Sequence, residues 1–577
     1  MGSAGDTSAS WLTLATAKRE AILGSIPEKW RLTKIPSVEE QRNVTGAYVQ
    51  QFLSPREVEI TGADAVGIVE KTTTGAWSAV EVIKAFCHRA SLSHQLVNCL
   101  HETFFDAALA DAEKLDAHFA EHGKPKGPLH GLPVSLKDQF HVKGVDTTMG
   151  YVGWIGTFQG QKEDPRSMKF ESEMVRELRQ LGAVLYCKTA VPHTLMCGET
   201  VNNIIEYTWN PTNRNLSCGG SSGGEGALIA LGGSPGGFGT DIGGSIRIPS
   251  AFNGLFGLRP TSGRLPYEGM ANSMDGQNSV LSVVGPLASS AGGVKLLTKS
   301  ILSAEPWLHD PLVAEIPWRG DLEAQTKELI ASSQLSVGFL DHDGIVAPHP
   351  PLKRALALLR GVVARSGNQA FEWQPPDYLH PRVAELTFKT WLYDGGADVR
   401  KDFALSGEPW APQILDVWQE RPEADASSIA ETNRALRQCR KEYLDYWNST
   451  KGALLSSSSG AEEHHRPADV FVAPCAPFAA VRPGRYDYIG YSSFVNGLDL
   501  PSVVVPITTV DKSVDVIDAS FQPASELDKK IQSDYDPELY DGAPVSLQII
   551  GRRYQEEKLM AIAEWLEGEL KKASPAT

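Results

Sequence analysis

The amino-acid sequence predicts an α/β protein in which helices pack against one large sheet. Its 577 residues are 42% hydrophobic and 21% charged, the composition of an ordinary globular chain that can bury a large core. Stretches with apolar residues three and four positions apart, typical of helices, alternate with short apolar runs typical of buried strands. Length alone favours about two to four domains. The alternation continues along most of the chain, however, and favours a single large domain.

The first 60 residues are expected to form an N-terminal helical extension that packs on this core. A helical stretch runs from about Ala15 to Leu23 and stops at Gly24, and a polar connection broken by prolines follows. Residues 61–577 are expected to form the single large domain. Its first helices are predicted over residues 63–72, after Ser78 as an N-cap, and after Asp106.

Lysines lie at the ends of two predicted strands. An apolar run over residues 132–136 leads directly into Lys137, and a predicted helix over 172–181 is followed by a strand over 183–189, near whose end Lys188 lies. Units of this kind build layered α/β sheets. Later strands are predicted over residues 335–340, 469–474, 501–508 and 543–550, with an amphipathic helix after the last.

Two later segments are expected to cover or border the core. Residues 291–450 are rich in helical and loop patterns, apart from the strand at 335–340, and are expected to cover a substrate pocket. Residues 452–467, with the sequence GALLSSSSGAEEHHRP, have low complexity and are expected to form an exposed loop.

Charge and composition exclude several classes of function. The formal net charge is −16 at pH 7 and no block of lysines and arginines occurs, so nucleic acid is not an expected partner. The seven cysteines are odd in number and form no CxxC pair, which favours reduced thiols over a disulfide framework. The chain shows neither an apolar signal core nor a run of about 18 apolar residues, so we expect a cytoplasmic protein without a membrane span.

No cofactor and no metal ion are expected. The segment GFGTDI matches a dinucleotide-binding fingerprint only in part, because Ile242 stands where the third glycine belongs. The histidines are scattered, His464 and His465 lie in the predicted exposed loop, and no HExxH pattern occurs.

Glycines and serines are concentrated between Cys218 and Pro249, around Ser221, Ser222 and Ser245. A serine nucleophile needs a base, and its oxyanion needs backbone N–H donors, which glycine-rich backbone can bring close. A flexible linker is the alternative, but the apolar stretches EGALIAL and IRIPSAF flank the serines and must be buried. GGSSG also matches a nucleophile elbow, but that motif needs a preceding strand, and a polar, turn-rich stretch precedes it here. The pattern therefore favours acyl chemistry outside the α/β-hydrolase class.

Three motifs resemble the amidase signature family, namely SLKD at 135–138, GGSSGG at 219–224 and TDIGGSIR at 240–247. The likeness extends from about residue 60 to about residue 565. It implies a large twisted mixed β-sheet covered by helices on both faces. The chain is most similar to the fungal acetamidases, through SIPEKW, GPLHGLPVSLKD and CGETVNNII, and it shares GGEGALI and GGSIR with fatty acid amide hydrolases.

The resemblance implies a catalytic triad of Lys137, Ser221 and Ser245. In it, Ser221 follows a cis peptide bond and Ser245 is the nucleophile. Burial lowers the pKa of a lysine, so Lys137 would be neutral at rest. Lys137 would then accept the proton of Ser221, while Ser221 accepts the proton of Ser245. The backbone N–H groups expected to hold the oxyanion are those of Ile242, Gly243, Gly244 and Ser245.

Other positions near these motifs are candidates for supporting roles. Asp241 and Arg247 could orient the glycine turn by charge-assisted bonds, and Ser222 could bond to nearby backbone; for each, a purely structural role is the alternative. The residues similar in place to the acyl pocket of the family are Leu195, Met196 and Cys197, for which plain core is the alternative.

The implied activity is hydrolysis of small carboxamides, acetamide-like and extending to aryl or longer amides, to a carboxylate and ammonia or an amine. One alternative is an enzyme for longer acyl amides, similar to fatty acid amide hydrolase. A second, of another class, is an amidotransferase-type subunit that acts in a complex. The resemblance also makes a homodimer one option, which the residues leave open.

Overall fold

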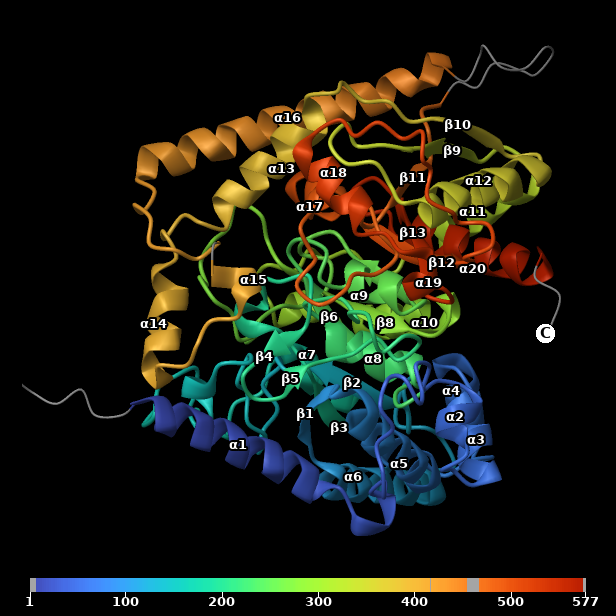
Figure 1. Ribbon diagram of the computed structural model, residues 1–577. Helices are drawn as coiled ribbons and strands as arrows, with labels where there is room; N and C mark the ends of the chain where they lie inside the picture. Colours follow the sequence, from blue (N-terminus) through green and yellow to red (C-terminus); the bar gives the residue numbers. More distant parts are fainter. Residues whose placement is uncertain (1–6, 416, 454–465, 574–577) are drawn as a thin grey trace, which may run out of the picture.

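The computed structural model of the protein describes residues 7–415, 417–453 and 466–573. Within these residues, eleven strands form one mixed sheet with helices packed against both faces (Figure 1), as the sequence predicts. The predicted exposed loop over residues 452–467 lies almost entirely outside the described residues, as do His464 and His465.

The strand order across this sheet is β1-β3-β2-β6-β8-β7-β12-β13-β11-β9-β10. Parallel pairs lie toward both ends, β3 with β2 and β2 with β6 at one end, and β11 with β9 and β9 with β10 at the other. The remaining pairs are antiparallel. The strands of the sheet are Leu100–Thr103 (β1), Pro133–Lys137 (β2), Val184–Thr189 (β3), Gly236–Asp241 (β6), Phe256–Arg259 (β7), Val283–Ala288 (β8), Ser336–Phe339 (β9), Gln369–Glu372 (β10), Val470–Pro474 (β11), Ser502–Thr509 (β12) and Pro544–Ile550 (β13).

Helices surround the sheet, and a short hairpin of Val201–Asn202 (β4) and Glu206–Tyr207 (β5) lies apart from it. The helices in the described residues are Thr7–Ser25 (α1), Ala47–Gln50 (α2), Pro55–Gly62 (α3), Ala65–Thr73 (α4), Ala79–Val97 (α5), Phe105–His122 (α6), Glu173–Gln180 (α7), Gly223–Ala230 (α8), Arg247–Phe252 (α9), Ala291–Leu302 (α10), Gly320–Ala331 (α11), Pro350–Arg365 (α12), Leu379–Thr390 (α13), Ala397–Ser406 (α14), Pro412–Leu415 (α15), Ala426–Ala453 (α16), Gly490–Leu498 (α17), Glu526–Ser533 (α18), Pro537–Tyr540 (α19) and Glu556–Ala573 (α20).

Alternation along the strands explains how both faces of the sheet are covered. On β2, Val134 and Leu136 join an apolar cluster with residues of α4, α7 and α10, so Lys137 points to the opposite face. On β11, alternate residues pack either with α13, α16 and α17 or with α12 and α20. The face toward which Lys137 points carries the candidate site.

Several predicted elements form where the sequence places them, including β2, β3, β9, β11, β12, β13 and α20. The predicted N-cap of α5 is confirmed, because Ser78 Oγ accepts a hydrogen bond from Glu81 N–H (3.1 Å). The helix predicted after Asp106 instead begins at Phe105. Asp106 thus lies in its first turn, where a carboxylate complements the helix dipole.

The N-terminal segment lies against the edge of the sheet that β1 forms (Figure 1). Helix α1 contacts β1 and α14, and its Lys18 forms ion pairs with Glu102 and Asp146. Helix α3, which begins with a capping box of Ser54 and Glu57, runs across the boundary expected at residue 60. The extension therefore continues into the core without a break at that point.

Five strands of the sheet have no counterpart among the sequence predictions: β1, β6, β7, β8 and β10. The sequence of β6 is GGFGTD, whose glycines hide the alternating apolar pattern of a strand. Glycine is needed here for close packing, because a Cβ at Gly239 would lie 2.5 Å from Ser222 Oγ. Residues 291–450 also supply β10 to the sheet, in addition to the predicted β9.

Candidate active site

Lys137 is the last residue of β2, and its side chain is completely buried. Its Nζ donates hydrogen bonds to Ser221 Oγ and Thr240 Oγ1, each 2.8 Å away. Thr240 lies in β6, the neighbouring strand, and Ser221 lies just before α8. The sheet therefore brings the predicted lysine and the first predicted serine together.

The pKa of Lys137 is lowered to about 7, because burial disfavours its charged form more strongly than Asp241 and Glu225 favour it. Its two hydrogen-bond partners are hydroxyl groups, which can donate to a neutral amine or accept from an ammonium group. Near neutral pH, Lys137 is thus divided between both forms, and the neutral amine can accept a proton.

Ser221 lies in a turn that is tied to the turn of Ser245. The Gly220–Ser221 peptide bond is cis, as the family resemblance implies. Ser222 N–H donates to the carbonyl oxygen of Ser245 (3.1 Å), and Thr240 N–H donates to Ser222 Oγ (3.4 Å). Ser222 thus has the backbone contacts expected of it.

Ser245 follows β6 and precedes α9, so the strand–turn–helix arrangement surrounds this serine and not Ser221. Its exposed fraction is 9%, compared with 1% for Ser221 and 0% for Lys137. Among the hydrogen bonds of the described residues, none joins the Ser221 and Ser245 hydroxyls, but both serines border one cavity. Exposure therefore increases from Lys137 to Ser245, the most accessible of the three at the cavity.

A buried ion pair holds the Ser245 turn. Arg247 Nε and Nη2 donate to the two carboxylate oxygens of Asp241, each at 3.0 Å. Asn496 Nδ2 donates to Asp241 Oδ1 (2.8 Å), and Arg247 Nη1 donates to Gln548 Oε1 (2.9 Å). Burial by itself raises the pKa of Asp241, but the charge of Arg247 lowers it below its usual range. Asp241 and Arg247 are thus placed to orient the glycine turn.

The same carboxylate changes the expected set of oxyanion donors. Gly244 N–H donates to Asp241 Oδ1 (2.8 Å), so the expectation that Gly244 helps to hold an oxyanion does not fit this arrangement. Within the described residues, the N–H groups of Ile242, Gly243 and Ser245 have no protein acceptor. The conformation of Gly244, with φ +130°, requires glycine. Its N–H therefore shapes the turn, and the other three remain available.

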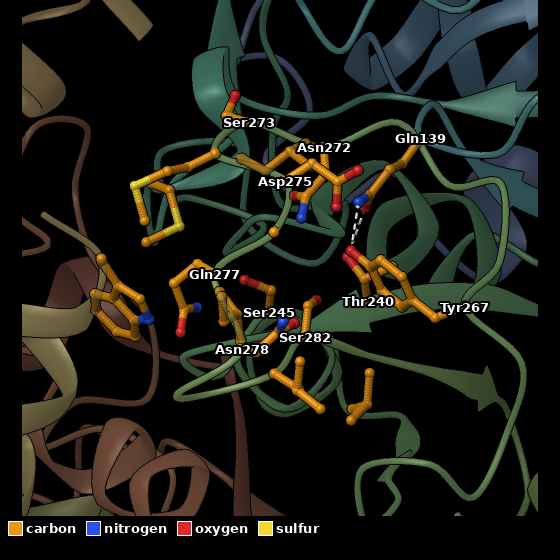
Figure 2. Close-up of a pocket in the computed structure, with 18 of the residues that line it drawn as sticks. Gln139, Thr240, Ser245, Tyr267, Asn272, Ser273, Asp275, Gln277, Asn278 and Ser282 are labelled. Carbon is orange, nitrogen blue, oxygen red and sulfur yellow. Dashed lines mark hydrogen bonds between the residues drawn. The ribbon is translucent and has the colours of Figure 1, made fainter. Parts of the chain in front are cut away.

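A chain of polar side chains continues from Lys137, and its members are not among the site residues predicted from the sequence. Thr240 Oγ1 donates to Gln139 Oε1 (2.8 Å), and Gln139 Nε2 donates to the hydroxyl of Tyr267 (2.8 Å). Figure 2 shows these three side chains grouped to one side of Ser245. Burial raises the pKa of Tyr267 to about 12, so it stays neutral. The available signal was position alone, because Gln139 follows SLKD and Thr240 opens TDIGGSIR; their bonding to each other and to Tyr267 had no sequence signal.

In the described residues, cavities of about 120 Å³ and about 150 Å³ both border Ser245. The first has a largely polar wall from the loop after Tyr267, including Asn272, Asp275 and Gln277 (Figure 2). Apolar surface predominates in both cavities, and more so in the second. The predicted pocket residues lie on these walls, Leu195 and Met196 on both and Cys197 on the second.

Residues from the 291–450 segment complete both cavities. Trp391 and Trp418 line each of them. A Cβ at Gly243 would lie 2.7 Å from the ring of Trp391, so this tryptophan packs directly on the Ser245 turn. The further residues that the segment adds to the second cavity are Phe388, Leu392, Gln413 and Val417.

Across residues 7–415, 417–453 and 466–573, no group of three or more histidine, cysteine, aspartate or glutamate side chains is arranged to hold a metal ion. No helix in this part of the chain combines the length and the apolar character needed to cross a membrane.

A family model described as Amidase matches residues 81–560. The chain belongs to the amidase family. Among curated proteins, this amidase is 46% identical to an acetamidase of Aspergillus oryzae, with 97% of this chain and 98% of the relative aligned. It is 44% identical to an acetamidase of Emericella nidulans, with 96% and 97% aligned. The predicted enzyme class is therefore confirmed.

The fold of this amidase also matches a solved structure of a fatty acid amide hydrolase. The TM-score is 0.87 at 32% sequence identity, and the match covers 98% of this chain and 96% of the other. The predicted architecture, a large mixed sheet with helices on both faces, is thus confirmed for the whole fold.

Proposed function

We propose that this amidase hydrolyses small carboxamides through an acyl-enzyme on Ser245, with Lys137 as the base and Ser221 as the proton bridge. The observation that carries the proposal is the 2.8 Å hydrogen bond between Lys137 Nζ and Ser221 Oγ, made by a buried lysine whose pKa is lowered to about 7. A base with a pKa close to the operating pH is well suited to proton transfer.

In the proposed first step, neutral Lys137 accepts the proton of Ser221, and Ser221 accepts the proton of Ser245. Ser245 Oγ then forms a bond to the carbonyl carbon of the amide, and the carbonyl oxygen becomes an oxyanion. The N–H groups of Ile242, Gly243 and Ser245 are the candidate donors to this oxyanion. Preorganised donors of this kind contribute strongly to acyl transfer.

In the second step, the C–N bond breaks as the proton returns from Lys137 through Ser221 to the leaving nitrogen. An amine leaves poorly unless it is protonated, so a relay that delivers this proton suits amides. Water then attacks the carbonyl carbon of the acyl-enzyme while its proton passes through Ser221 to Lys137. The bond from this carbon to Ser245 Oγ breaks, Ser245 takes the proton back through the same relay, and the acid product leaves as the carboxylate.

The preferred substrates are proposed to be acetamide-like amides. This follows from the high likeness to two acetamidases over nearly the whole chain. A specific observation favours longer acyl amides as the second candidate, because the apolar cavity of about 150 Å³ borders Ser245 and the fatty acid amide hydrolase shares the fold. A series of aliphatic amides from two to twelve or so carbons would separate these candidates by kcat/KM.

The proposed acyl-enzyme is tested on the purified chain alone. We expect wild type to release ammonia from acetamide, and a rapidly quenched reaction with an activated anilide to give an acyl adduct on the peptide that contains Ser245. The control is Ser303→Ala, an exposed serine at the end of α10, which keeps the adduct, whereas Ser245→Ala loses it together with activity. An adduct on another residue contradicts the proposal, and a chain that is inactive without partner proteins favours the amidotransferase-type alternative.

A further inference from the structure

Glu225 is a completely buried carboxyl group that the proposed mechanism does not use. It lies in the first turn of α8, just after the Ser221–Ser222 turn. Its Oε2 accepts a hydrogen bond from Ser135 Oγ (2.6 Å), and its Oε1 accepts one from Thr189 Oγ1 (2.8 Å). Both donors are neutral hydroxyls, so no ion pair explains why a carboxyl group is kept in this position.

The two donors frame the position of Lys137 on the sheet. Ser135 lies two residues before Lys137 in β2, on the same face of the strand. Thr189 in β3 is paired directly with Lys137 across the parallel ladder, and neighbouring strands are only about 4.8 Å apart. The carboxyl group thus lies on the same face of the sheet as Lys137, held by the residue two positions before it and the residue paired with it, and the charges of the two groups act on one another.

The strand on the other side leaves room for this carboxyl group. Gly237 of β6 is paired with Ser135. A Cβ at Gly237 would lie 2.1 Å from Glu225 Oε2 and 2.3 Å from Ser135 Oγ. The glycine therefore has a packing reason: any larger residue would displace the carboxyl group that stands beside Lys137.

Few charged and titratable groups surround Glu225 and Lys137. Lys137 is the cation that acts on Glu225, while Asp241 and Glu225 are the anions that act on Lys137. The other titratable groups that face Glu225 are the buried Cys99, Tyr186 and Cys187. Burial raises the pKa of each of these three well above its usual value, so they stay neutral over the working range of pH.

We propose that Glu225 is a positioning residue whose charge sets the pH at which Lys137 becomes a base. The inference rests on the proposed function, and it extends that function from the three proposed catalytic residues to the control of the base. When Glu225 is ionised, its negative charge favours the ammonium form of Lys137. When it is protonated or replaced by a neutral group, Lys137 loses its proton at lower pH.

Glu225 and Lys137 titrate over the same range of pH. Burial raises the pKa of Glu225 to about 7. The hydrogen bonds from Ser135 and Thr189 and the positive charge of Lys137 act in the opposite direction, but burial has the larger effect. The pKa of Lys137 lies in the same range, so the two groups titrate as a pair and not independently. The acid limb of the pH profile in wild type therefore contains the titration of both groups.

The test compares Glu225→Gln with Glu177→Gln. Glu177 in α7 is also completely buried, and burial raises its pKa to about 8, but it does not act on Lys137. For each variant we would measure kcat/KM for acetamide from pH 5 to pH 9, and the rate at which a fluorophosphonate modifies Ser245 over the same range. We expect Glu225→Gln to move the acid limb of both profiles down by about one pH unit, and Glu177→Gln to leave it in place.

The possible results separate failure of the Glu225 inference from failure of the proposed function. A limb that stays in place or moves upward in Glu225→Gln overturns this inference alone, whereas a wild type whose Ser245 does not react overturns the proposed function and the inference with it. If Glu225→Gln does not fold, Thr189→Val removes one hydrogen bond to the ionised carboxylate and is expected to move the limb in the same direction by a smaller amount. Thr189→Ser, which keeps the hydroxyl, should restore the wild-type limb, and an unmoved limb in Thr189→Val counts against the inference.

Discussion

Two buried lysines at the ends of neighbouring strands have different environments. Lys137 in β2 and Lys188 in β3 are both completely buried. Lys137 donates to two hydroxyl groups, whereas Lys188 forms an ion pair with Asp138 (2.8 Å) and also donates to the Asp146 carbonyl oxygen and to the Thr147 hydroxyl. Leu136, which precedes Lys137, is the residue paired with Lys188, so the two side chains leave the sheet on opposite faces.

The type of partner decides what each lysine can do. A bonded carboxylate stabilises the ammonium form, whereas hydroxyl partners stabilise it less and leave burial to favour the neutral amine. A lysine next to hydroxyls can therefore serve as a base, and a lysine paired with a carboxylate serves as a fixed cation. Because the local sequence patterns are alike, the same substitution at each position gives a matched comparison.

Lys137→Met is expected to have the largest effect on catalysis. Loss of the proposed base should lower kcat/KM for acetamide by about 10²–10⁴-fold, measured at pH 8. Removing a buried lysine whose pKa is lowered also removes the cost of neutralising it, so we expect the free energy of unfolding to fall by no more than about 1 kcal/mol. A variant that keeps wild-type activity would rule out Lys137 as the base.

Lys188→Met is expected to lower stability strongly and activity only slightly, the reverse of Lys137→Met. It leaves the buried Asp138 carboxylate without its cation, which costs about 3–5 kcal/mol of unfolding free energy, measured by urea denaturation. Activity per folded molecule should change by less than about tenfold, because Lys188 lies on the opposite face of the sheet from the proposed base. Equal losses of activity in the two variants would contradict the assignment of Lys137 as the base and Lys188 as a structural cation.

Some residues of the candidate site could be predicted from the sequence, and others could not. Lys137, Ser221 and Ser245 could be predicted, because the residues around them form continuous motifs. The hydrogen-bond chain from Thr240 through Gln139 to Tyr267 could not, since it joins three segments that only the folded sheet brings together.

The strand β6, the role of Gly244 N–H and the position of two tryptophans could not be predicted either, because each depends on how the backbone folds. The pattern GGFGTD hid the strand β6, because its glycines serve close packing and not apolar alternation. The use of Gly244 N–H by Asp241 follows from the shape of the turn, which residue types do not specify. Likewise, Trp391 and Trp418 reach the site from a segment whose place over the core no local pattern reveals.

The pH profile of kcat/KM for acetamide tests most directly whether Lys137 is a base that is neutral at rest. Because burial lowers the pKa of Lys137 to about 7, its neutral form is gained as pH rises through this value and lost below it. Wild type should therefore show an acid limb with a midpoint near pH 7, and the residual activity of Lys137→Met should lack that limb. The same midpoint in both proteins would contradict the account, because some other group would then be the one that titrates.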